Sequence, residues 1–85
     1  MNEIEKALKA ASVSMQIIQS QENLAFIKRS IEYCECWLSE HGTGDNRETA
    51  ESDLSFMQDV VKTLEQKIKE LEADESLILQ NNPTE

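Results

Sequence analysis

The sequence predicts an all-α fold, in which two long helices form an antiparallel helical hairpin with a coiled-coil-like seam. The 85 residues include two Gly and one Pro and are rich in Glu, Lys, Leu and Ile, a composition typical of helices. Apolar residues recur at steps of three and four in both halves of the chain. A short Gly-containing segment separates the halves and predicts a turn.

The first helix is expected from about residue 3 to residue 40. Its seam consists of Leu24, Ile27, Ile31, Cys34 and Leu38, and continues upstream through Ile17, Val13 and Ala10 if Ser20 is a polar interruption. A second stripe at helical spacing consists of Ile4, Leu8, Ala11, Met15 and Ile18. The seam and this second stripe lie on different faces, which leaves two alternatives. The helix is either continuous and apolar on two faces, or it is broken near residues 20–22, with Ser20 as the N-cap of a new helix. The absence of Gly and Pro at 20–22 favours a continuous helix.

The turn is expected at residues 41–45, HGTGD. Gly42 can adopt the left-handed conformation that ends a helix. Asp45 can cap the next helix, with Glu48 three residues later as its capping-box partner. A turn of this length makes the two helices antiparallel neighbours.

The second helix is expected from about residue 46 to residue 79. Its seam consists of Ala50, Leu54, Met57, Val61, Leu64, Ile68 and Leu71. Residues 1–80 are therefore predicted to form one helical domain, and the polar end NNPTE, residues 81–85, a disordered tail.

The two seams fit one register. If the helices fold back on each other, the numbers of facing residues should add to a constant. They add to 88 in the pairs Leu38–Ala50, Cys34–Leu54, Ile31–Met57, Ile27–Val61, Leu24–Leu64 and Ile17–Leu71. Because each seam was identified separately, this agreement supports a single continuous hairpin.

The aromatic residues lie on one side of the predicted hairpin. In heptad notation, with Leu24 and Leu54 at position a, positions c and g lie beside the seam on the same flank. This aromatic flank consists of Phe26, Tyr33, Trp37, Phe56 and Val60. Such an apolar surface marks an interface. It predicts either the core of a homodimer, forming a four-helix bundle, or a groove for a partner's amphipathic helix.

The chain is acidic, and its charge is unevenly distributed. The net charge is −9, of which residues 1–40 contribute −2 and residues 41–85 contribute −7. This charge disfavours nucleic acid and anionic membranes and favours a protein partner with a basic surface. A cluster of four acidic residues lies near the end of the second helix, where the helix dipole disfavours negative charge. The cluster consists of Glu70, Glu72, Asp74 and Glu75. It is either a solvated helix end or an acidic contact surface.

The sequence does not predict an enzyme, a metal site or a cofactor. Cys34, Cys36 and His41 are the closest approach to a metal site, but residues two apart on a helix point about 200° apart. Zinc requires four converging ligands. Cys34 is expected in the seam and Cys36 in solvent, and one His with few Gly provides no recognisable catalytic constellation.

Two functions are consistent with these features. The first is a non-catalytic, cytoplasmic interaction module: an acidic homodimer that binds and inhibits or adapts another protein through its charged exterior. The alternative is a small chaperone or escort that binds a client's amphipathic helix on the aromatic flank. A cytoplasmic location is predicted because the sequence has no secretion leader, no membrane-length apolar run and no disulfide framework.

Overall fold

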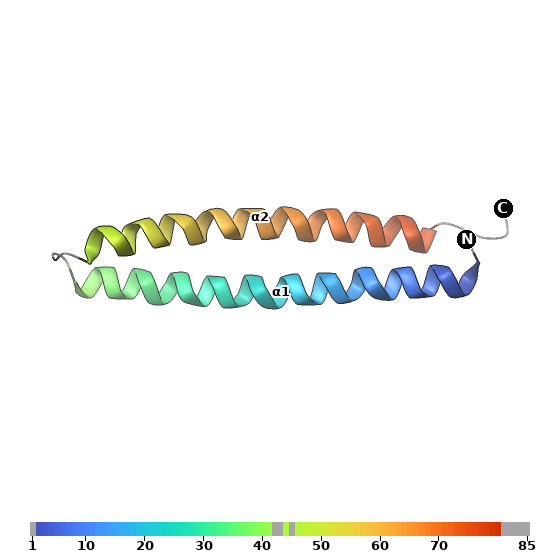
Figure 1. The fold of residues 1–85 in the computed structure, drawn as a ribbon, viewed down its shortest axis with the longest axis horizontal. Coiled ribbons are helices and arrows are strands. Elements are labelled where there is room, and N and C mark those ends of the chain that lie inside the picture. The colour runs from blue at the N-terminus through green and yellow to red at the C-terminus, as the bar shows by residue number, and fades with distance from the viewer. Residues whose placement is uncertain (1, 42–43, 45, 81–85) are drawn as a thin grey trace.

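The computed structural model describes residues 2–41, 44 and 46–80, and these form an antiparallel two-helix hairpin (Figure 1). Helix α1 spans Glu3–Glu40 and helix α2 spans Arg47–Gln80. The helices pack along their whole length as a rod of 65 × 14 × 13 Å. The all-α hairpin predicted from the sequence is therefore confirmed.

Helix α1 runs without interruption through residues 20–22. It begins at Asn2, whose side-chain oxygen accepts a hydrogen bond from the backbone N–H of Glu5 at 2.8 Å, as an N-cap residue does. Ser20 is only 4% exposed. It occupies a seam position opposite Ile68 in the 88 register, and it does not begin a new helix.

The seam residues form the core between the two helices. Ile17 and Ile68 are the most buried apolar side chains, each 8% exposed. The other seam residues predicted on α2 are half-buried: Ala50, Leu54, Met57, Val61, Leu64 and Leu71. Ser14–Glu75 and Cys34–Ala50 are hydrogen-bonded between the helices, and these pairs lie within about one helical turn of the 88 register.

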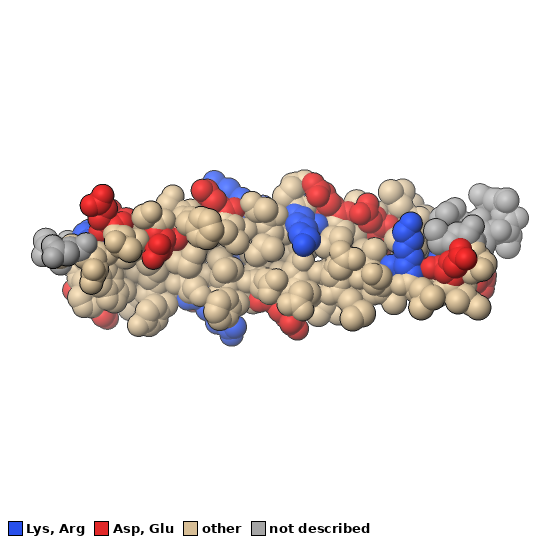
Figure 2. All heavy atoms as spheres, viewed as in Figure 1, with Lys and Arg blue, Asp and Glu red and all other residues tan. Residues whose placement is uncertain are grey.

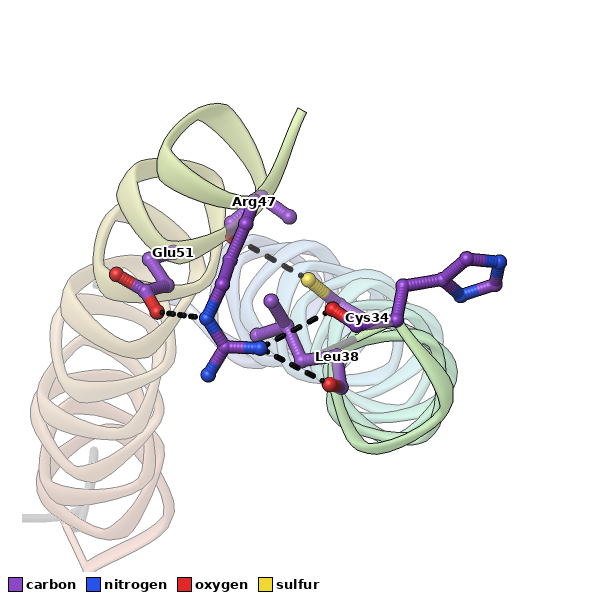
Figure 3. Close-up of polar contacts among 6 residues, drawn as sticks. Cys34, Leu38, Arg47 and Glu51 are labelled. Atoms are coloured by element: carbon purple, nitrogen blue, oxygen red, sulfur yellow. Dashed lines mark hydrogen bonds and ion pairs between the residues drawn. The ribbon is translucent and has the colours of Figure 1, made fainter. Parts of the chain in front are cut away.

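The end of α1 is held by a side chain from the start of α2 (Figure 3). One guanidinium nitrogen of Arg47, Nη1, donates to the carbonyl oxygens of Leu38 at 3.1 Å and His41 at 3.2 Å. Arg47 Nε also lies 2.9 Å from Glu51 Oε1. The last carbonyls of a helix have no partner within that helix, so Arg47 caps α1 and fixes its position against α2. Gly42 and Asp45, the caps predicted from the sequence, lie outside the described residues, as does the tail 81–85.

Replacing Arg47 with Ala should destabilise the hairpin at the turn. The substitution removes two hydrogen bonds from a charged donor, and we expect a loss of about 1–3 kcal/mol in the free energy of unfolding. Thermal unfolding followed by circular dichroism at one protein concentration measures this loss. Glu51→Ala is the control, because it removes only an exposed ion pair worth about 0.3–0.5 kcal/mol. Equal melting temperatures for Arg47→Ala and wild type would show that Arg47 does not cap α1.

Candidate functional site: the aromatic flank and the acidic surface

The aromatic flank lies largely in solvent in the isolated hairpin. Tyr33 is 77% exposed, Phe56 68% and Phe26 61%. Trp37 and Val60 are half-buried. The Trp37 ring stacks on the His41 ring, with centroids 4.4 Å apart and planes inclined by 14°. This stack fixes the Trp37 ring at the turn end of the flank.

Two open grooves follow this flank between the helices. The larger has a volume of about 480 Å³, and its lining includes Phe26, Tyr33, Trp37, Cys34, Ala50 and Met57. The smaller, of about 270 Å³, is lined by Asn23, Phe26, Ile27, Val60 and Leu64. Phe26 lines both grooves, so the two are neighbours on one apolar surface. Arg29 and Asp53 add one charge of each sign to the larger groove.

The four acidic residues near the end of α2 do not share one face. Glu70, Glu72 and Asp74 are exposed, whereas Glu75 is half-buried. The Glu75 carboxylate accepts a hydrogen bond from the Ser14 hydroxyl of α1, so Glu75 belongs to the contact between the helices. Glu70 accepts a hydrogen bond from Gln66 Nε2 at 3.2 Å. Three carboxylates, those of Glu70, Glu72 and Asp74, therefore remain on the exterior.

Charged and uncharged side chains are unevenly distributed over the surface. On the face shown in Figure 2, acidic and basic groups lie mainly along α2 and at the edges of the molecule, and uncharged atoms cover broad areas of α1. The flank opposite the aromatic residues is polar, with Lys28 Nζ 3.9 Å from Glu65 Oε2 across the two helices. The two flanks of the hairpin therefore differ in polarity.

The cysteines and the histidine do not converge. The Cys34 thiol donates to the Ala50 carbonyl oxygen at 3.4 Å, and exposed Cys36 donates to Glu40 Oε1 at 3.8 Å. The His41 Nδ1 lies 2.9 Å from the Trp37 carbonyl oxygen, to which it can donate. Among the residues that the structure describes, no three His, Cys, Asp or Glu side chains are grouped as metal ligands would be. Neither described helix is both long and apolar enough to cross a bilayer.

Two features of this surface were not predicted from the sequence. Arg47 stands one seam step before Ala50, and that spacing could have indicated that its side chain lies against α1. Glu75 stands one seam step after Leu71, so its half-buried position was also present in the pattern. In both cases the charge of the residue obscured its place in the seam.

Comparisons with protein-family models, curated proteins and solved structures found no match for this chain.

Proposed function

We propose that this chain is a non-catalytic protein-interaction module, an acidic homodimeric helical hairpin that inhibits or adapts another protein through its charged exterior. The observation that carries this proposal is the exposed aromatic flank of a hairpin that is only two helices thick. Phe26, Tyr33 and Phe56 are each more than 60% exposed. Clustered large apolar side chains of this kind typically mark an interface.

Self-association supplies the second apolar layer that a single hairpin lacks. Among the described residues, no side chain is fully buried. A second pair that packs on it as a four-helix bundle would add to the stability of this helix pair. The dimer would bury the aromatic rings, which contribute large apolar areas to an interface.

The exterior of such a dimer is strongly acidic, because each copy has a net charge of −9. A target with a basic surface would be attracted over a distance, and its association would slow as salt is added. Glu70, Glu72 and Asp74 are the exposed acids nearest the end of α2 and are the proposed contacts.

Neutralising these acids should weaken capture of the target. The variant Glu70→Gln, Glu72→Gln and Asp74→Asn is immobilised and exposed to lysate of the source cell, beside wild type and a matched control that loses three charges on α1, Glu32→Gln, Glu35→Gln and Glu40→Gln. Three exposed contacts at about 0.5 kcal/mol each predict roughly tenfold weaker retention of the target. The α1 control should retain the target as wild type does, and added salt should release the target from wild type and from the control. Equal retention by the two variants would contradict a role for the α2 acids.

The alternative function is a small escort that binds a client's amphipathic helix on the aromatic flank. The open groove of about 480 Å³ beside Phe26, Tyr33 and Trp37 favours it, because helix-in-groove recognition uses such apolar grooves. The escort requires a vacant flank and therefore a monomer, whereas the interaction module requires a dimer.

A further inference from the structure

Helix α1 has a second apolar stripe, distinct from its seam. Its members include Ile4, Met15, Phe26 and Trp37, each eleven residues after the last, with Leu8, Ile18 and Tyr33 between them. All of these except half-buried Trp37 are 55–77% exposed. We call these seven residues the outer stripe. It joins the N-terminal apolar residues to the aromatic flank as one surface.

The apolar residues of the outer stripe and those of the seam recur at different spacings along α1. A repeat of eleven residues corresponds to about 3.67 residues per turn, close to the 3.6 of a straight helix, so the stripe runs nearly parallel to the axis of α1. Among the residues that the structure describes, the large apolar side chains exposed on α2 are those of Phe56, Leu77 and Leu79. The longer exposed apolar stripe, of seven residues, therefore lies on α1.

We infer that the outer stripe binds α1 of a second copy, antiparallel, with facing residue numbers that add to 41. This inference rests on the proposed self-association and specifies its geometry. In this register six of the seven stripe residues face one another, in the pairs Ile4–Trp37, Leu8–Tyr33 and Met15–Phe26, and Ile18 faces Asn23. Each pair occurs twice about the two-fold axis. An isologous interface requires such self-complementarity.

The polar residues of the stripe fit the same register. The two-fold axis falls between residues 20 and 21, and residues 10–21 contain no charged side chain. They face residues 20–31 of the second copy, whose charged side chains are Glu22, Lys28 and Arg29. Few ions therefore lose water at the centre, and the loss of water is the main cost of burying charge. Glu22, which interrupts the stripe, faces Gln19 of the second copy, whose amide can donate to the carboxylate. Arg29 faces Ser12, a small polar residue that leaves the guanidinium space to reach solvent.

The length of the stripe suits a specific dimer. From residue 4 to residue 37 it extends roughly 50 Å, and a helix contact about 10 Å wide covers roughly 500 Å² on each copy. The total, about 1,000 Å², reaches the lower limit for a specific interface. Phe56 and Leu79, exposed on α2, lie at the levels of Glu32 and Lys9 in the 88 register. In this register they are level with the two ends of the stripe and would enlarge the contact.

Distances between spin labels on the two copies test this register. The native Cys36 thiol is exposed and can be labelled alone in a Cys34→Ala variant whose helicity is checked first. In the proposed dimer, Cys36 lies level with Glu5 of the second copy, so the two labels should be about 45 Å apart along the axis. A second variant, Asn23→Cys with Cys34→Ala and Cys36→Ser, places labels near the two-fold axis, less than about 25 Å apart.

A short distance at residue 23 with a long distance at residue 36 is the expected result. Short distances at both sites would mean that the turns of the two copies lie together, which overturns the register but leaves the dimer intact. Long distances at both sites would place α1 outside the interface and also overturn the inference. A protein that shows no interchain distance and sediments as a monomer would refute the proposed self-association itself.

Discussion

Replacing Ile17 with Asp is expected to abolish cooperative folding of the hairpin. Ile17 is 8% exposed and faces Leu71 in the seam. The substitution removes a packed apolar side chain and puts an unpaired carboxylate between the helices, a change that costs on the order of 3–5 kcal/mol. A small domain has little stability to lose. Loss of the helical signal and of a sigmoidal melt by circular dichroism would record this effect.

The adjacent isoleucine provides a matched control. Ile18 is 55% exposed on the outer stripe, so Ile18→Asp introduces the same charge one residue along the chain without entering the seam. This variant should keep its helicity and fail only in self-association. If both variants unfold to the same extent, the seam and the outer stripe are not distinct surfaces. A native-like melt for Ile17→Asp would contradict the observed burial of that side chain.

The double substitution Trp37→Glu with Phe56→Glu is expected to dissociate the dimer while sparing the helices. Phe56 is 68% exposed, and the ring of half-buried Trp37 stacks on His41. Neither residue belongs to the seam that holds α1 against α2. Buried aromatic residues at interfaces commonly contribute about 2 kcal/mol or more each. Because the dimer loses four rings and gains four carboxylates, the dissociation constant should rise at least about 1,000-fold.

Sedimentation equilibrium and circular dichroism of this variant, measured together, separate dissociation from unfolding. Ser55→Glu with Gln58→Glu is the matched control, since it adds the same charge to exposed polar positions on the opposite flank of α2. The control should sediment as wild type does. If the aromatic variant keeps the wild-type mass, the aromatic flank is not the surface through which the copies associate.

The sequence was sufficient to predict the hairpin because its core is periodic. One register placed Ile17 against Leu71 and, across the polar interruption, Ser20 against Ile68, and the structure buries Ile17, Ser20 and Ile68. The role of Arg47 was harder to predict, because it depends on how far a long side chain reaches back to Leu38 and His41.

The outer stripe was incompletely predicted for a different reason. Heptad positions describe a seam that winds around the helix, and in that frame the N-terminal stripe and the aromatic flank fall on different positions. Their continuity follows from the eleven-residue spacing of Ile4, Met15, Phe26 and Trp37 and from the exposure of the stripe. The target of the acidic exterior could not be predicted, since exposed carboxylates such as Glu72 specify the sign of a partner's charge and little of its shape.

The solution mass of the wild-type chain is the most direct test of the proposed homodimer. Sedimentation equilibrium in reducing buffer, over a wide range of concentrations, excludes crosslinking through exposed Cys36. The proposal predicts a species of twice the 9.7 kDa chain mass that dissociates only on dilution. A folded monomer of 9.7 kDa at every concentration would contradict it. The aromatic flank would then be vacant, as the escort function requires.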